Sequence, residues 1–188
     1  LANELQSSIG GLSLDAAQVF DAVAGVHSRV EGSYSVIAMI AGHGLLAFRD
    51  PLGIRPLVLG RRHTELHREE WIVASESLVL ESGGYEIVRD VAPGEAILIS
   101  PGGEMRSRQC ATAPRLVPCA FEYIYLARPD SVLSGIAVYD ARLRLGDALA
   151  DQIVSEMSID DVDVVMPIPD SARPSAMQVA QKLGLPYR

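Results

Sequence analysis

The chain has 188 residues, of which 48% are hydrophobic, and it carries a formal net charge of −8. This length is enough for one large domain or two small ones, and no apolar run approaches the roughly 18 residues that a membrane span requires. The negative charge argues against binding to nucleic-acid backbones, which needs clustered Lys and Arg. We therefore expect a soluble globular protein with neither nucleic acid nor membrane as a partner.

The first half of the chain predicts a helix followed by antiparallel hairpins. Residues 15–30 have Asp15 in the first turn and valines at helical spacing, namely Val19, Val23, Val26 and Val30. From Ser33 onwards, short apolar runs broken by Gly, Pro or charged residues are typical of hairpins, with "AGHG" and "SPGGE" as two of the connections. "WIVASES" predicts a strand that leads into a short helix.

The stretch "AFRDPLGIRPLVLG", residues 47–60, joins two of these strands. Asp50-Pro51 and Gly53 are typical turn residues. The stretch therefore predicts a tight turn in which Arg49, Asp50 and Arg55 pair locally.

The pattern changes at "CATAPRLVPC", where two prolines and no periodicity predict a linker and a domain boundary around residues 111–118. The following "AFEYIYLARPDS" predicts an aromatic strand. Residues 139–157 predict a helix with one apolar face, formed by Leu145, Leu149 and Ile153.

The remainder predicts a parallel α/β unit that is begun and not finished. "DVDVVMPIP" and "LPYR" are expected to be strands. Between them, "PSAMQVAQKLG" predicts a helix that ends at Gly184 and turns four side chains inward, those of Ala176, Val179, Ala180 and Leu183.

Asp170 and Ser171 stand between the end of the predicted strand 161–169 and this helix. Ligands of open parallel sheets bind at such loops, and free N–H groups at a helix start bind anions. A carboxylate beside a hydroxyl can also hold a divalent cation, directly or through water. The alternative is a plain helix N-cap, since Asp and Ser are favoured there whatever the function. The residues alone leave both interpretations open.

The other candidate residues give weaker signals. Cys110 and Cys119 form no CxxC motif and are expected to be reduced thiols. The four histidines have no metal-ligand spacing, and no arrangement typical of a Ser-His-Asp triad is readable.

Taken in order, several stretches resemble the glutamine–PRPP amidotransferase (amidophosphoribosyltransferase) family. They are "GSYSVIAMIAGHGLLAFRDPLGIRPLVLG", "VASES", "RDVAPGEAILI", "FEYIYLARPDS", "VYDARLRLG" and "DVVMPIPDS". The resemblance runs from about residue 30 to the end. "FEYIYLARPDS" and "PIPDS" are specific to the family, whereas strings like "FRDPLGIRPL" also occur in other N-terminal-nucleophile amidotransferases such as asparagine synthetase.

The resemblance implies an α+β fold followed by an α/β fold. Residues 1–112 would form the C-terminal part of a type 2 glutamine amidotransferase domain, an N-terminal-nucleophile sandwich of antiparallel sheets with helices. Residues 113–188 would form a linker and the N-terminal part of a type I phosphoribosyltransferase domain with a parallel sheet. In this family the first domain releases ammonia from glutamine, and an internal channel carries it to the second, which binds PRPP with Mg²⁺ and makes phosphoribosylamine for purine synthesis. A homo-oligomer and a cytoplasmic location are implied as well.

The resemblance also implies roles for individual residues. "PIPDS" matches the loop that handles the pyrophosphate of PRPP, with Ser171 at the metal and Asp170 beside it. Phe121 and Tyr125 match aromatic positions that line the ammonia channel and the interdomain contact. Pro174 departs from the pattern, because it removes a backbone donor in the first turn of the next helix. Some members hold an iron–sulfur cluster, for which Cys119 is a candidate first ligand, but nothing else in the sequence supports the cluster.

No catalytic residue is expected in this chain. The family's glutaminase nucleophile is an N-terminal Cys, whereas residue 1 is Leu. The main PRPP signature has two acids after an apolar strand, and Asp160-Asp161 instead precedes its strand. We therefore expect an internal fragment that is inactive alone. The alternatives are another type 2 glutamine amidotransferase and a non-catalytic scaffold or interaction protein derived from the family.

Overall fold

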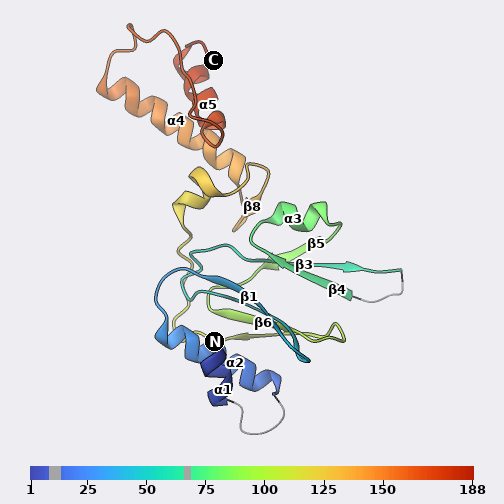
Figure 1. Ribbon diagram of the computed structural model, residues 1–188. Helices are drawn as coiled ribbons and strands as arrows, with labels where there is room; N and C mark the ends of the chain where they lie inside the picture. The colour runs from blue at the N-terminus through green and yellow to red at the C-terminus, as the bar shows by residue number, and fades with distance from the viewer. Residues whose placement is uncertain (9–13, 66–68) are drawn as a thin grey trace. The chain divides into compact units, whose positions relative to one another are not determined.

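The computed structural model describes residues 1–8, 14–65 and 69–188, which form two compact units, Leu1–Cys119 and Ala120–Arg188 (Figure 1). The sequence placed the boundary after residue 112, so residues 113–119 lie with the first unit instead. Within the described residues, no helix is both long and apolar enough to cross a membrane.

The first unit contains two antiparallel sheets. One has the strand order β1-β2-β6-β7, with bounds Ser35–Ile40, Gly44–Arg49, Glu95–Ile99 and Met105–Gln109. The other has the order β4-β3-β5, with bounds Glu69–Ala74, Val58–His63 and Glu86–Asp90. The pairs β1–β2 and β6–β7 are the hairpins that the sequence predicts across "AGHG" and "SPGGE".

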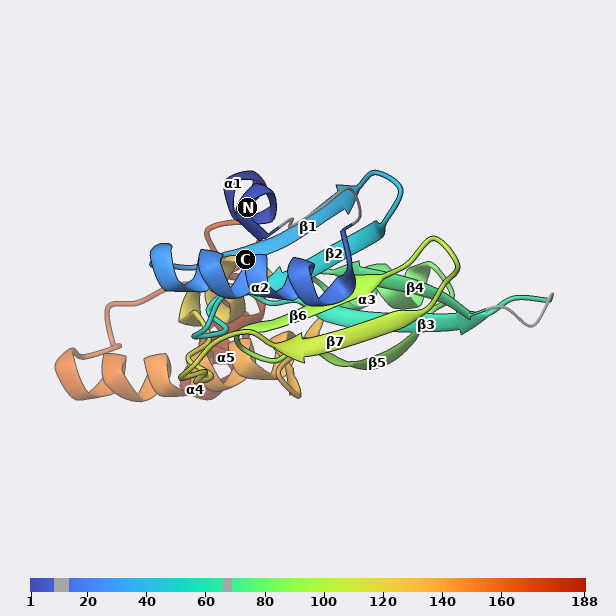
Figure 2. The same cartoon turned by 90° about the horizontal axis from the view of Figure 1, so that it is seen from below.

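The sheets are stacked between helices. Helices α1 (Ala2–Ser8) and α2 (Ala16–Arg29) lie on the outer side of the first sheet, and α3 (Ser77–Ser82) lies on the outer side of the second (Figures 1 and 2). Alternation along β2 explains the layering, because successive side chains of a strand point to opposite faces. Leu46 and Phe48 pack against α2, whereas Ala47 packs against the second sheet. Both faces of β2 are therefore buried.

Helix α2 confirms the prediction from the valine spacing. Asp15 is its N-cap, and a reciprocal capping box joins the Asp15 and Gln18 side chains to the backbone N–H groups of each other. Val19, Val23 and Val26 are buried, but Val30 is 46% exposed because it lies beyond the helix end. The short helix α3 after "WIVASES" is also confirmed.

In the second unit, the predicted aromatic strand is wrong. Its residues form a π-helical turn, η1 (Glu122–Leu126). A two-stranded hairpin follows, in which β8 (Val132–Leu133) pairs with β9 (Ile136–Ala137). Arg142 explains the difference, since its guanidinium donates to the carbonyl oxygens of Tyr123 (2.8 Å) and Ala127 (2.7 Å). In a strand, these carbonyl groups would accept hydrogen bonds from a neighbouring strand. Here the Arg142 side chain, which is distant in sequence, satisfies them instead.

Helix α4 (Val138–Glu156) is confirmed, but the apolar face that the sequence indicates is not its buried face. Leu145 and Leu149 are 41% and 49% exposed, and the buried positions are Val138, Arg142, Gly146 and Ala150. Close packing against α5 (Arg173–Leu183) is the reason. A Cβ atom on Gly146 would lie only 2.6 Å from the Ser175 carbonyl oxygen, so this face requires small residues.

The predicted parallel strands are not formed as strands. Within the described part of the chain, parallel pairing is limited to one bridge between Val165 and Tyr187, with the Val165 N–H donating to the Pro186 oxygen (2.9 Å). Pro167, Pro169 and Pro186 have no N–H group, so the ladder cannot extend through them. Helix α5 between the two segments is confirmed, with Val179 and Ala180 buried and Gly184 ending it at φ 70°.

Glu95 makes the stability of the first unit depend on pH in the acidic range. Its two oxygens accept from Arg89 at 2.6 and 2.7 Å, and one also accepts from the Ala92 N–H at 2.8 Å. Burial raises the pKa of Glu95, but the Arg89 and Ala92 bonds outweigh it, and the pKa is below its ordinary value of 4.5. Because the pKa of Glu95 is lower in the folded than in the unfolded protein, the ionised side chain stabilises the fold at pH values above the unfolded pKa. This stabilisation is lost as the pH falls through the folded pKa.

We therefore expect the free energy of unfolding, measured by urea titration, to fall as pH is lowered below about 4.5. Glu95→Gln should be less stable than the unsubstituted protein at neutral pH, with a flatter acid dependence. Glu104→Gln is the matched control, because Glu104 makes only an exposed ion pair with Arg106. An unchanged acid slope in Glu95→Gln would contradict the assignment.

Candidate functional site

The Asp170–Ser171 turn leads directly into α5 in the second unit. The helix begins at Arg173, and its N-cap position is occupied by Ala172, whose methyl group cannot accept a hydrogen bond. The interpretation of Asp170 and Ser171 as a plain N-cap is therefore wrong. The Asp170 side chain is 81% exposed, and its Oδ1 lies 2.8 Å from Nη2 of Arg173. The Pro169–Asp170 peptide bond is cis.

The chemistry available at this turn is that of oxygen ligands in contact with solvent. Asp170 offers a carboxylate and Ser171 a hydroxyl, which are donors that hard cations prefer. The backbone contributes less to an anion site here. Pro174 has no N–H, and the Arg173 N–H already donates to the Asp170 carbonyl oxygen at 3.2 Å. Side chains rather than first-turn amides are thus the main polar groups of the turn.

An apolar cavity of about 450 Å³ lies beside the turn in the second unit. It is lined by residues of α4, of α5 and of the segment 162–168, and it reaches Ala172 and Ser175 next to the turn. Ile168 and Met166 from this segment are 83% and 68% exposed. The lining is suited to packing against apolar groups and not to holding a charged ligand.

Phe121 and Tyr125 lie at the π-helical turn of the second unit. They are 63% and 65% exposed, which is unusual for large aromatic side chains. Tyr123 of the same turn is directed inward, and its hydroxyl donates to the Leu133 carbonyl oxygen at 3.1 Å. A cavity of about 360 Å³ adjoins the turn and is lined by Tyr123, Ile124, Ile136, Ala141 and others.

A loop at residues 50–55 carries the most deeply buried charges of the first unit. Asp50 is fully buried, and its carboxylate accepts from the backbone N–H groups of Leu52 (3.0 Å), Ile54 (3.0 and 3.1 Å) and Arg55 (3.3 Å). The tight turn is confirmed, and Asp50 and Arg55 do pair, but through the backbone of Arg55.

Arg49 completes this arrangement from the end of β2. It is 3% exposed, and its guanidinium donates to the carbonyl oxygens of Arg55 (2.6 Å), Gly53 (2.7 Å) and Val91 (2.8 Å). One buried anion therefore satisfies amide groups and one buried cation satisfies carbonyl groups of the same loop. Sequence reasoning missed this burial, although an Arg-Asp pair directly after an apolar strand was its signal.

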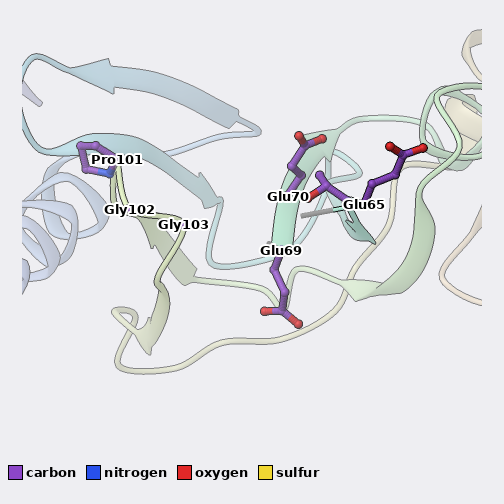
Figure 3. Close-up of a pocket in the computed structure, with 7 residues that line it drawn as sticks. Glu65, Glu69, Glu70, Pro101, Gly102 and Gly103 are labelled. Carbon is purple, nitrogen blue, oxygen red and sulfur yellow. The ribbon is translucent and has the colours of Figure 1, made fainter. Parts of the chain in front are cut away.

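A cavity of about 920 Å³ in the first unit is an open acidic groove. Figure 3 shows Glu65, Glu69 and Glu70 on one side and Pro101–Gly103 on the other. The acids on β4 already pair with basic residues of β3. Glu70 lies 2.7 Å from Arg62, and Glu69 lies 3.7 Å from Arg61. The Glu69 and Glu70 carboxylates thus have local ion-pair partners and are not evidence for a ligand site.

The cysteines give no evidence of reactive thiols. Both are free, and Cys110 is buried, which raises the pKa of its thiol and keeps it protonated. In the described residues no three His, Cys, Asp or Glu side chains come together as a metal site.

Known proteins resemble this chain along most of its length. An amidophosphoribosyltransferase from Pseudomonas aeruginosa is 52% identical over 170 residues, which are 90% of this chain and 34% of that protein. The Escherichia coli protein of the same name is 49% identical over 175 residues, 93% of this chain and 35% of its own length. The chain thus spans about a third of the length of these relatives. No protein-family model matches it.

A solved structure agrees with these relatives. The glutamine phosphoribosylpyrophosphate amidotransferase from B. subtilis, in complex with ADP and GMP, superposes with a TM-score of 0.80 at 32% identity. The superposition covers 100% of this chain and 37% of that one.

We expect Asp50→Ala to lower the free energy of unfolding by about 3–5 kcal/mol, because it leaves the part-buried amides of the loop without their acceptor. Asp50→Asn should cost less, since its amide keeps one acceptor oxygen. Thermal or urea unfolding measures both. Asp21→Asn is the control, as it removes only an exposed ion pair with Arg108. A cost for Asp50→Ala no larger than that of the control would show that the carboxylate does not hold the loop.

Proposed function

The chain is a homologue of the amidophosphoribosyltransferases, and we propose that it is part of an enzyme that makes 5-phosphoribosylamine from glutamine, PRPP and water in purine synthesis. The observation that carries this proposal is the 52% identity over 170 residues with the P. aeruginosa protein. Because the first unit ends at residue 119, the aligned residues extend into both units. This favours the proposal over another type 2 amidotransferase, which would share only the first.

We assign the first unit to the later part of the glutaminase domain, an N-terminal-nucleophile sandwich. Two stacked antiparallel sheets with helices outside support this assignment. The second unit is assigned to the start of a type I phosphoribosyltransferase domain. Its support is the parallel bridge between Val165 and Tyr187 on either side of α5, which is the connection that a parallel sheet needs. No residue of this chain is assigned to the glutaminase chemistry, and the chain alone is expected to be inactive.

The Asp170–Ser171 turn is proposed to bind the pyrophosphate side of PRPP, with Ser171 as a metal ligand and Asp170 beside it. These residues fit Mg²⁺, which keeps several waters and takes one or two protein oxygens together with substrate phosphates. When bound, the ion supplies positive charge against the charge that builds up on the departing pyrophosphate. The Arg173 guanidinium holds the Asp170 carboxylate in position at 2.8 Å, while the exposure of that carboxylate leaves it accessible to ligand and water.

The remaining assignments follow from the same proposal. Phe121 and Tyr125 are proposed to line the ammonia path and the interdomain contact, which their exposure supports. The parent enzyme is proposed to be a cytoplasmic homo-oligomer. The two cysteines of this chain, Cys110 and Cys119, do not by themselves support an iron–sulfur cluster.

Ser171→Ala and Asp170→Asn in the longer enzyme that contains this chain test the PRPP site. Each removes one contact to the metal or its waters and should lower kcat/KM for PRPP by about 10- to 150-fold, or roughly 1.5–3 kcal/mol. Glutamine hydrolysis should be largely unchanged, because a separate domain performs it. PRPP kinetics and the melting temperature are measured on the same two variants.

Asp163→Asn is the matched control, because it removes an exposed acid outside the turn and should leave PRPP kinetics unchanged. A purely structural role would instead cost about 1 kcal/mol of stability with normal PRPP kinetics. That result in both variants would overturn the assignment of the turn.

A further inference from the structure

The segment 115–119, called the strap here, is bound to the loop 50–55, called the dock. Three backbone hydrogen bonds join them. The N–H groups of Arg115, Val117 and Cys119 donate to the carbonyl oxygens of Pro51 (3.0 Å), Leu52 (2.7 Å) and Ile54 (3.2 Å). Alternate residues of the strap donate, which is the periodicity of an extended strand lying along an edge.

The prolines of the strap region fit this one-sided pairing. Pro114 and Pro118 alternate with the three donors, at positions where an N–H would point away from the dock. Proline is tolerated on an edge strand in this orientation, because it removes no bond of the ladder. The prolines of "APRLVPC" suggest a free linker, but in this register they are compatible with a segment that is hydrogen-bonded to the dock.

The buried carboxylate of Asp50 organises the surface that receives the strap. Leu52 and Ile54 donate their N–H groups to Asp50 and accept from the strap through their carbonyl oxygens. Gly53 between them has φ 58°, and a Cβ there would lie 2.9 Å from Pro93 and 3.1 Å from the Leu116 side chain. A glycine is required for this turn and for the close approach of Leu116.

The strap ends at Cys119, which is also the last residue of the first unit. The dock therefore keeps the connecting chain in the first unit up to this residue, although residues 112–118 are exposed. Three hydrogen bonds on an exposed edge are a modest restraint, so the strap can also detach without unfolding the sheets.

We propose that the dock supports ammonia transfer between the two domains. By binding the strap, it fixes the point at which the connecting chain leaves the first unit. This inference rests on the proposed function, in which ammonia released by one domain is used by the next. With the strap docked, the connecting chain is held to the first unit up to Cys119. With the strap detached, the free connection that follows the first unit is longer, and under this proposal ammonia escapes to solvent before PRPP is aminated.

The test uses Val117→Pro in the longer enzyme, since proline removes the central and shortest of the three donors. Leu116→Pro is the backbone control, because the Leu116 N–H donates no hydrogen bond to the dock, and Leu116→Ala is measured beside it to report the loss of the side-chain approach to Gly53 alone. Hydrogen exchange of residues 115–119 should be about fivefold faster in Val117→Pro than in the control. Glutamate released per PRPP consumed should rise roughly twofold or more, because the detached fraction sets the leak. PRPP consumption with added ammonium should match the control.

If Val117→Pro is not obtained as a folded enzyme, Arg115→Pro carries the same expectation at the exposed start of the strap. Its control is Arg115→Ala, which loses the side chain but keeps the N–H. Faster exchange with an unchanged glutamate-to-PRPP ratio would overturn the coupling role, and unchanged exchange would overturn the docking itself. An unsubstituted enzyme that neither hydrolyses glutamine nor consumes PRPP would instead reject the proposed function, and the coupling role with it.

Discussion

The carboxylate of Asp50 is the group on which the first unit depends most. It is fully buried, and burying a charge is costly unless hydrogen bonds replace its hydration. Here the backbone N–H groups of Leu52, Ile54 and Arg55 replace it, while Arg49 serves the carbonyl groups of the same loop. This half-buried loop connects β2 of one sheet to β3 of the other, and its polar backbone groups need hydrogen-bond partners. Two side chains of opposite charge solve this within seven residues of the chain, "RDPLGIR".

This arrangement has a consequence beyond the loop. Because Asp50 holds the N–H groups of Leu52 and Ile54 on one side, their carbonyl oxygens are presented on the other, where the strap binds. Arg49 also reaches the Val91 carbonyl oxygen, and so links the loop to the chain that leads into β6. The same pair of charges thus joins the end of β2, the approach to β6 and the segment leaving the unit. Removing either charge would disturb all three.

Elements fixed by neighbours in the sequence were predictable, and elements fixed by distant partners were not. The helix that starts near Asp15, the hairpin turns and the Gly184 helix end depend on residues a few positions apart, and the structure confirms them. The π-helical turn depends on Arg142, which comes from the next helix. The inner face of α4 depends on how closely α5 approaches Gly146. The apolar periodicity of α4 indicated the face with the leucines, whereas the face buried against α5 is the one with Gly146, because the two helices approach closely there.

The two notable aspartates of this chain show why sequence alone left the candidate site open. Asp50 and Asp170 each follow an apolar segment and precede a turn, and composition does not distinguish them. The structure does, because the Asp50 side chain is fully buried whereas that of Asp170 is 81% exposed. A buried carboxylate that accepts from several backbone amides has its hydrogen-bonding capacity used in holding the fold. An exposed one, positioned by a single arginine and not used as a helix cap, retains that capacity for a ligand. Exposure therefore supports a structural role for Asp50 and is consistent with the ligand-binding role proposed for Asp170.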